Sequence, residues 1–312
     1  MNRRRFLQTS CIAGLGLAAG VTPALAQAVT PGAKRGAGSR MDYIFFSKGL
    51  QGQSIEQMIE SVKRMGAEGF DLAVRPGYPV HPENVAEALV PAAEKIRAAG
   101  LSVPMVTTPT TLNKSSEPYV EPLFRACGQA KVELVKVGYW RFPGQDYWKA
   151  VDAMKRDVEG FARVGAKYGV KPCLHTHSGT NLAQNASSLM HVLNDFDPKQ
   201  VGAYLDPGHL NLCGEPLAMA FDMTAPWLSA VAIKDSIKYK SDAGSVRSRF
   251  LPVGEGTVEW DAMMRWLVAR SFAGPLSFHS EFESDSMEYL IGQTAKDVAY
   301  LRKIESDLRA KG

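Results

Sequence analysis

The sequence predicts a single (β/α)8 barrel, an α/β fold of the TIM-barrel type. Apolar runs alternate with amphipathic segments eight times between residues 42 and 306, and no low-complexity segment or linker interrupts them. Strands that alternate with helices over about 250 residues form a parallel sheet, and eight such units favour a closed barrel. No Gly-rich GxGxxG turn follows the first run, which argues against a dinucleotide-binding sheet.

The elements follow from local pattern. In the segment 54–66, Ser54 is a predicted N-cap, apolar residues recur at helical spacing from Ile55 to Val62, and Gly66 ends the helix. Similar helical patterns cover residues 82–100, 147–169, 258–274 and 286–305. The predicted strands are, in chain order, DYIFFS, GFDLAV, LSVPMVTT, VELVKVG, VKPCLHTH, VGAYLDPG, LSAVAIKD and PLSFHSEFE.

The first 26 residues have the pattern of an export signal. A basic start, a short apolar run and a small-residue site ending at Ala26 are typical of such segments, and the run RRRFL from Arg3 to Leu7 resembles the twin-arginine signal. We therefore expect a periplasmic protein exported through the twin-arginine pathway. Residues 27–41 are predicted to be a flexible linker, and residues 42–312 the catalytic barrel.

Charge and cysteine content narrow the class of partner. Removal of the signal takes away three arginines and lowers the formal charge from +4 to +1, so neither nucleic acid nor an anionic membrane surface is indicated. The apolar run of the signal is too short for a membrane span. Cys127, Cys173 and Cys213 remain, an odd number without metal-binding spacing. A small molecule is the expected partner, and association into a homo-oligomer stays open.

Alternation along the strands decides which polar side chains face the barrel interior, because residues two apart share a face. Barrel enzymes carry their chemistry at the carboxyl ends of the strands. Any one of these residues alone is explained as well by a core hydrogen bond, a turn or a solvated rim charge. Four consecutive strands, five to eight, nevertheless each end in ionisable residues, and in every strand the alternation places them on the inward face. The inward-facing residues are Asp71, Arg75, Lys136, His175, His177, Tyr204, Asp206, Lys234, His279, Glu281 and Glu283.

Carboxylates and imidazoles that converge in a partly dry cavity are costly unless a cation or a shared proton offsets them. A divalent metal is the simplest offset. Oxygen and nitrogen ligands without thiolate suit Mn, Mg, Co or Zn, and no spacing here chooses among them.

Several segments together resemble the xylose-isomerase-like barrels, the sugar phosphate isomerase and epimerase family that includes inosose dehydratase. The resemblance covers nearly all of residues 42–306, and the strand-five segment is similar to the paired-histidine motif of the inosose dehydratase branch. The segments that carry it are LHTHSGT, YLDPGHLNLCGE, AIKDS, PVGEGTVEW and AGPLSFHSEFE.

The resemblance implies a metal held by an acid on strand five, Asp on strand six, His on strand seven and Glu on strand eight. The matching positions are His175 in place of the strand-five acid, Asp206 with its companion His209, and Glu281 with Glu283 as its rival. At strand seven the expected histidine is Ala232, which cannot be a ligand. Two of the four positions therefore depart from the family pattern.

The leading hypothesis is an isomerase or epimerase that acts on an unphosphorylated sugar or keto-sugar through a metal-stabilised enediolate. His175, Asp206 and Glu281 are the predicted metal ligands. The predicted catalytic residues are Glu283, His177, His209 and Lys234, and the predicted substrate-binding residues are Arg75, Lys136 and Trp140. One alternative is a dehydratase or β-eliminating lyase on a keto-inositol or 3-keto-glycoside, with an imidazole protonating the leaving group. Another is a non-catalytic periplasmic sugar-binding barrel, with aromatic residues near the end of strand four stacking on the sugar.

Overall fold

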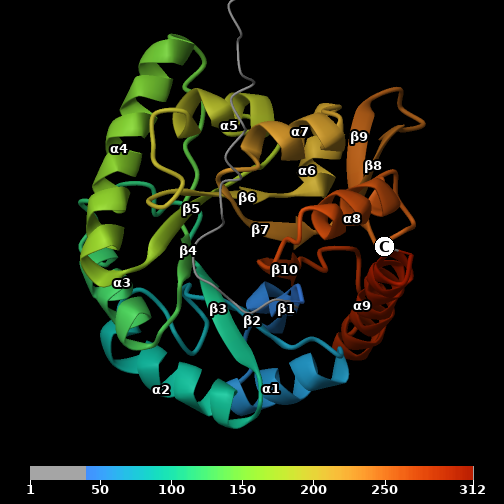
Figure 1. The fold of residues 1–312 in the computed structure, drawn as a ribbon, viewed down its shortest axis with the longest axis horizontal. Coiled ribbons are helices and arrows are strands. Elements are labelled where there is room, and N and C mark those ends of the chain that lie inside the picture. The colour runs from blue at the N-terminus through green and yellow to red at the C-terminus, as the bar shows by residue number, and fades with distance from the viewer. Residues whose placement is uncertain (1–39, 312) are drawn as a thin grey trace, which may run out of the picture. The chain divides into compact units, whose positions relative to one another are not determined.

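Eight parallel strands form a closed barrel, surrounded by helices, in the computed structural model of the protein, which describes residues 40–311 (Figure 1). Around the barrel the strand order is β1-β10-β7-β6-β5-β4-β3-β2, so the last strand closes on the first. Every pairing within the barrel is parallel. The predicted (β/α)8 barrel is therefore confirmed. The predicted signal, residues 1–26, and residues 27–39 of the predicted linker lie outside the described residues.

Each barrel strand lies within one of the eight predicted apolar runs. The strands are β1 (Asp42–Phe46), β2 (Gly69–Ala73), β3 (Ser102–Thr107), β4 (Leu134–Lys136), β5 (Lys171–His175), β6 (Gly202–Leu205), β7 (Leu228–Ile233) and β10 (Pro275–Phe278). The helices are η1 (Ser47–Leu50), α1 (Ile55–Arg64), α2 (Val85–Ala98), α3 (Val120–Gln129), α4 (Tyr147–Tyr168), α5 (Ala186–Leu193), α6 (Pro207–Cys213), α7 (Leu217–Thr224), α8 (Trp260–Ala269) and α9 (Met287–Arg309).

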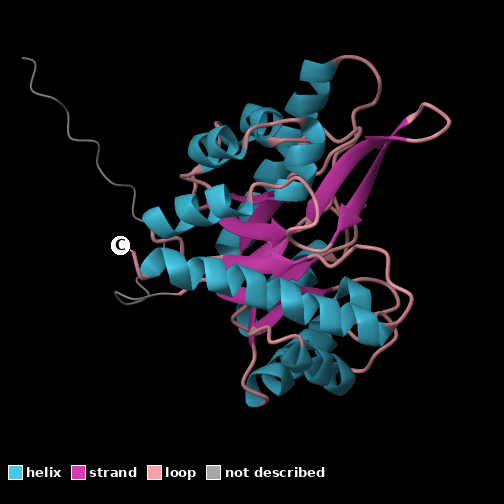
Figure 2. Cartoon of the chain, turned by 90° about the vertical axis from the view of Figure 1, so that its right-hand side faces the viewer, coloured by secondary structure: helices cyan, strands magenta, loops and turns pink. Residues whose placement is uncertain are grey.

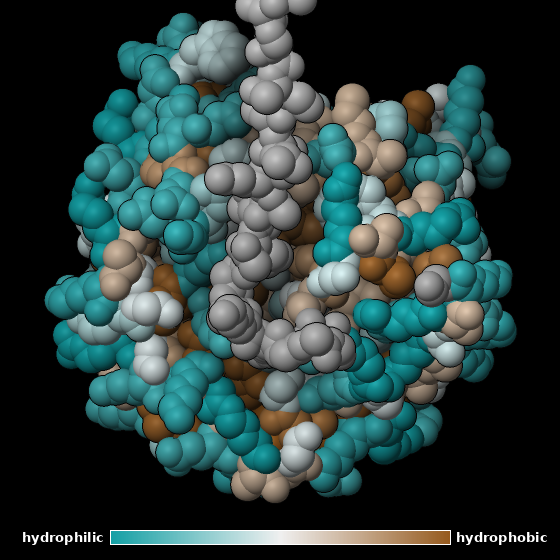
Figure 3. All heavy atoms as spheres, in the orientation of Figure 1, coloured by the Kyte–Doolittle hydropathy of each residue, from teal (hydrophilic) through white to brown (hydrophobic). Residues whose placement is uncertain are grey.

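Local sequence accounts for the helix ends. At α1 the Ser54 side chain accepts the backbone N–H of Gln57, and the Gln57 side chain accepts the backbone N–H of Ser54, so that two otherwise unpaired donors are satisfied. Gly66 follows the end of α1 with a φ of 69°. The outward faces of the helices are mostly hydrophilic (teal in Figure 3), because their apolar faces pack against the barrel.

The two faces of the strands bury different sets of side chains. Residues that point outward form the large apolar core between strands and helices. The inward residues form a separate small cluster inside the barrel: Ile44, Met105, Leu134, Cys173, Tyr204, Ala230 and Ala232. This period-two alternation is the one on which the sequence prediction rested. The ionisable residues beyond this cluster on the same face are therefore carried to the barrel mouth.

A two-stranded hairpin between β7 and α8 was not predicted. Its strands are β8 (Asp235–Lys240) and β9 (Val246–Leu251), which pair antiparallel. Figure 2 shows the hairpin projecting beyond the body of the barrel, away from the end at which α9 stops. Most of its residues are exposed, so no hydrophobic face marks it in the sequence.

The loop that follows the hairpin, residues 252–258, is held by one buried carboxylate. Asp235 accepts the backbone N–H groups of Gly254 (2.9 Å), Gly256 (3.1 Å) and Val258 (3.2 Å). It also accepts the indole N–H of Trp260 at 2.8 Å. A Cβ on residue 256 would lie 2.1 Å from Asp235 Oδ1, which requires glycine there. The PVGEGTVEW motif is thus a loop built around an aspartate.

The described residues show neither a membrane-spanning helix nor a disulfide. No helix in residues 40–311 has the length and apolarity needed to cross a bilayer. Cys127, Cys173 and Cys213 are free thiols, the first two buried and the third partly so.

Candidate active site

Most of the residues singled out from the sequence meet at the carboxyl ends of the strands. Lys234, just after β7, is central: its Nζ lies 2.6 Å from Glu281 Oε2 and 3.4 Å from Asp206 Oδ2. His175 at the end of β5 brings its Nε2 to 3.5 Å from Asp206 Oδ2. His209 in α6 places its Nε2 3.3 Å from Lys234 Nζ. These five side chains form one connected cluster, which we call the mouth cluster.

Asp206 is fully buried and caps α6. Its Oδ1 accepts the backbone N–H of His209 at 3.1 Å, and Pro207 at the first helical position lacks an N–H to satisfy. Its Oδ2 has no hydrogen-bond donor among the described residues. Burial by itself raises the pKa of Asp206, but the positive charge of Lys234, together with the interactions of the His209 and His175 rings, holds it well below its usual range. The carboxylate is therefore ionised, with one oxygen available to a ligand.

His175 is the second residue with an available atom. Its Nδ1 lies 3.0 Å from the Tyr139 hydroxyl, whereas its Nε2 has no hydrogen-bond partner among the described residues. Burial lowers the pKa of His175 well below its usual value, although Asp206 opposes this. The ring is therefore neutral, which is the form that binds a metal.

His177 and His209 pack ring against ring, with centroids 3.9 Å apart. His209 Nδ1 lies 2.8 Å from the Ser178 hydroxyl. Burial is the main cause that lowers the pKa of His209 to about 3, and it also lowers the pKa of His177. Both imidazoles are therefore neutral near pH 7.

Lys234 and Glu281 form the charged centre of the cluster. Burial disfavours the ammonium, but Asp206 and Glu281 raise the pKa of Lys234 above its usual value. Burial likewise works against the Glu281 carboxylate, yet Lys234 and the other cations around it lower its pKa. Glu281 is also 2.6 Å from Lys48 Nζ. Both groups are charged, and the Glu281 carboxylate is shared by two lysines.

A third histidine joins this end of the barrel. His279 follows β10 with 6% of its surface exposed, and its ring stacks on that of His175 at 5.6 Å between centroids. Ligand atoms of His175, Asp206 and His279 all lie within 4.8 Å of one another. Sequence analysis placed His279 on the inward face but not among the ligands. The parity that located His175 is the signal that would have included it.

These residues fit a divalent cation. The two buried atoms without a hydrogen bond, His175 Nε2 and Asp206 Oδ2, are 3.5 Å apart. That is about the separation of two ligands on one ion with bonds of about 2.1 Å. Two imidazoles and a carboxylate suit Mn, Co or Zn. Ala232 is buried in the barrel interior and supplies no ligand, and the structure surrounds Glu281 with lysines.

The remaining predicted residues lie as follows. Arg75 is half-buried near the mouth, where its Nε donates to the Thr108 carbonyl at 2.9 Å. Glu283 is exposed and lines a surface depression with Ser284. Trp140 is 9% exposed, and its indole N–H donates to Asp157 of α4 at 2.9 Å. The geometry does not bring Glu283 or Trp140 to the mouth cluster, and their predicted roles stay predictions.

An aromatic residue from the hairpin covers part of the mouth cluster. The Phe250 ring centroid lies 4.6 Å from Lys234 Nζ, and the ring meets that of His209 edge to face at 5.4 Å. Nothing in the sequence marked Phe250, because it belongs to the hairpin that was not predicted.

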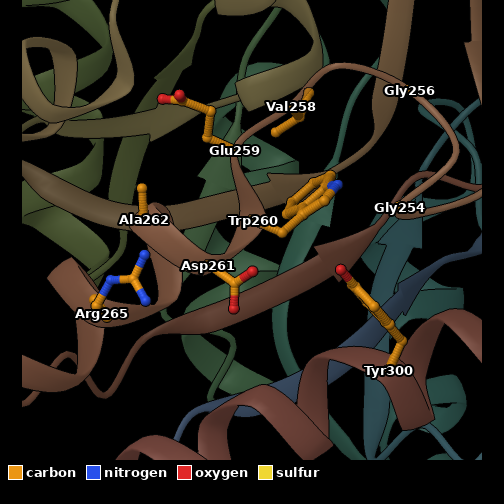
Figure 4. A pocket seen from close by; sticks show the side chains of 9 residues that line it. All are labelled: Gly254, Gly256, Val258, Glu259, Trp260, Asp261, Ala262, Arg265 and Tyr300. Carbon is orange, nitrogen blue, oxygen red and sulfur yellow. The ribbon is translucent and has the colours of Figure 1, made fainter.

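A second depression lies beside the loop 252–258, and no histidine is among the residues that line it (Figure 4). Its lining includes Trp260, whose indole is already bonded to Asp235, and Tyr300 of α9. The ionisable groups gather at the strand ends instead, which places the candidate site there.

The profile of the xylose isomerase-like TIM barrel family matches residues 59–304. The chain belongs to this family. The resemblance noted in the sequence is confirmed at the level of the family. Among curated proteins, no significant sequence match was found.

Solved structures of this barrel type share the fold at low identity. The 3-keto-D-glucoside 4-epimerase of E. coli superposes with a TM-score of 0.65 at 16% identity, over 85% of this chain and 100% of that one. The D-psicose 3-epimerase of Clostridium cellulolyticum H10 gives 0.67 at 14% identity, over 85% and 99%. The probable 3-DHS dehydratase of Bacillus anthracis gives 0.63 at 18% identity, over 83% and 99%.

Proposed function

We propose that this xylose isomerase-like barrel is an enzyme that isomerises or epimerises an unphosphorylated sugar or keto-sugar by moving a proton next to a carbonyl. The carrying observation is the pair of buried atoms without a hydrogen bond, His175 Nε2 and Asp206 Oδ2, beside a protonated lysine and two neutral imidazoles. Barrels of similar fold that act as sugar epimerases support this assignment.

In the proposed reaction, His175, Asp206 and His279 would hold a divalent cation. When bound, such a cation supplies a Lewis acid for the carbonyl and hydroxyl oxygens of the sugar. Lys234 is a second positive centre, fixed by Glu281, that stabilises the negative charge developing on oxygen.

We assign the base to the pair of His177 and His209, whose neighbouring rings are neutral and reach the mouth. Glu283 is less suitable because its side chain lies at the surface. Two neighbouring imidazoles suit an isomerisation, in which the proton leaves one carbon and returns at the next.

β-Elimination is the second candidate function. After the same proton removal, the imidazole that is not the base would protonate a leaving group, as in a dehydratase. The 3.9 Å distance between the ring centroids of His177 and His209 favours it, because base and acid would stand side by side. Analysis of the products separates the two: an isomer retains the mass of the substrate, whereas elimination lowers it.

The test is hydrogen exchange with solvent. Wild-type protein loaded with Mn, Co, Mg or Zn is incubated in D2O with ketoses and 3-keto glucosides, and deuterium at the carbon next to the carbonyl is followed by NMR. We expect exchange with at least one sugar, lost in His209→Gln. Wild type that binds no stoichiometric metal and exchanges no substrate hydrogen would contradict the proposal.

We further propose that the chain is exported to the periplasm through its first 26 residues, on the evidence of RRRFL alone. Fractionation of cells expressing the full chain tests this. The wild type should appear in the periplasm, and the variant with Arg3→Lys and Arg4→Lys should stay in the cytoplasm.

A further inference from the structure

Lys136 carries a buried amine that makes no hydrogen bond and has no counterion within residues 40–311. It is the last residue of β4, pairs in register with Thr107 and Cys173 of the adjacent strands, and shares the inward face with Leu134. Only 1% of its surface is exposed, and its Nζ has no hydrogen-bond acceptor among the described residues. A lysine in such surroundings is normally paired with a carboxylate.

The nearby carboxylates are all engaged elsewhere. Asp71 accepts hydroxyl groups from three sides, Thr107 (2.6 Å), Tyr204 (3.2 Å) and Ser277 (3.1 Å). Glu281 is bonded to Lys234 and Lys48, and Asp206 faces Lys234. Lys136 is thus left without a counterion, while Lys234 has two.

The surroundings of Lys136 favour the uncharged amine. Burial is the largest cause that lowers the pKa of Lys136 well below its usual value, and the cations Arg75 and Lys234 lower it further. The charges of Asp71 and Glu281 act in the opposite direction without prevailing. The amine packs on the Tyr139 ring, 3.7 Å from its centroid, and Tyr139 in turn contacts His175. A neutral amine next to the mouth cluster is a nucleophile.

We propose that Lys136 condenses with the carbonyl group of a keto-sugar to form an imine. The nitrogen lone pair attacks the carbonyl carbon, and the carbonyl π electrons move to oxygen. The two hydrogens of the amine end on that oxygen, which leaves as water, and the carbon–nitrogen double bond forms. No oxidant, reductant or other co-reactant is needed.

This inference deepens the proposed function and takes its substrate class, a keto-sugar, from it. A protonated imine withdraws electrons from the neighbouring C–H bond, as the Lewis acid of the proposed reaction does. The barrel lacks a ligand at Ala232, where the family resemblance implies a histidine. Lys136 would supply an electron sink from the chain itself.

Reductive trapping tests the proposal. Full-length protein is incubated with 1,3-dihydroxyacetone, D-fructose or D-tagatose and sodium cyanoborohydride, and the products are examined by intact mass and peptide mapping. We expect one adduct per chain, located on Lys136, that saturates with sugar and persists with chelator present. Lys136→Met should remove it. Lys149→Met, which changes an exposed lysine at the start of α4, should leave it unchanged.

Absence of an adduct with dihydroxyacetone would overturn the proposal, because this ketone is small enough to enter a site shaped for any sugar. Equal labelling of wild type and Lys136→Met would also overturn it. If Lys136→Met does not fold, the peptide map of the wild type decides alone. Exchange in D2O measured on the same samples separates the two ideas. Hydrogen exchange without an adduct would support the proposed function and contradict the imine. An adduct without hydrogen exchange would support the imine and contradict the proposed function.

Discussion

Asp206 and Asp235 are both fully buried and both lie at strand ends near Lys234, yet they do different things. Asp235 accepts five N–H groups, those of Ser236, Gly254, Gly256, Val258 and Trp260, and has no capacity left. Asp206 accepts one N–H on Oδ1, and its Oδ2 is left without a donor. A saturated buried carboxylate holds the scaffold together, whereas an unsaturated one is available to a ligand. The aspartate of the IKDS segment, Asp235, therefore has a structural role. The aspartate of the strand-six motif, Asp206, is the one available for chemistry.

The largest effect is expected at the unsaturated aspartate. Asp206→Asn removes the negative charge of this carboxyl but keeps an N-cap of equal quality for α6. We expect exchange activity to fall by about 10³-fold. The free energy of unfolding should fall by less than in Asp235→Asn, because Glu281 still pairs with Lys234. Deuterium exchange and urea unfolding measure the two quantities. A large loss of stability with activity retained would reverse the contrast.

The saturated aspartate should give the opposite result. In Asp235→Asn an amide group faces backbone and indole donors, so we expect a loss of about 3 kcal/mol in the free energy of unfolding. Asp261→Asn, an exposed neighbour in α8, is the matched control and should be within about 0.5 kcal/mol of wild type. Urea unfolding at pH 7 compares them. Equal stability of the two variants would show that Asp235 does not hold the loop.

Asp297 is a third buried carboxyl, and its effect on stability should depend on pH. Burial raises the pKa of Asp297 in α9 to about 7, although its hydrogen bond from Gln293 opposes this. The folded state therefore binds a proton more tightly than the unfolded one. The resulting stability is complete below about pH 4 and is lost as the pH rises through 7.

We expect wild type to lose about 2–4 kcal/mol of stability from Asp297 between pH 4 and 8, and Asp297→Asn to lose correspondingly less. Unfolding free energies across this range provide the comparison. Parallel pH profiles for the two proteins would exclude a raised pKa.

The smallest effect concerns Trp140, predicted from sequence to bind substrate. Trp140→Phe removes the indole bond to Asp157 and should cost about 1–2 kcal/mol in the free energy of unfolding, with KM unchanged. Thermal unfolding and steady-state kinetics measure the pair. An increased KM with an unchanged free energy of unfolding would instead support the predicted role of Trp140 in substrate binding.

Sequence predicted the barrel and the convergence of His175, Asp206 and Lys234 because strict alternation governs residues inside a strand. It was less informative beyond the strand ends. β10 stops at Phe278, and past it the parity that grouped Glu281 with Glu283 no longer applies, since Glu281 turns to the lysines and Glu283 to solvent.

Long-range partners were also out of reach. The choice of Asp157 by the Trp140 indole depends on how α4 packs, and the placement of Phe250 depends on a hairpin whose exposed strands carry no hydrophobic face. Neither is a property of neighbouring residues. Pattern analysis therefore identifies which strand ends hold chemistry better than it identifies which side chains complete it.

Lys234 gives the barrel a counterion that is covalently attached. Its ammonium balances Asp206 and Glu281 whatever else occupies the mouth. A site that depended on a diffusible ion for this balance would be strained whenever it was empty. Here the balancing charge is part of the fold, so the two carboxylates stay paired with it whether or not a ligand is bound.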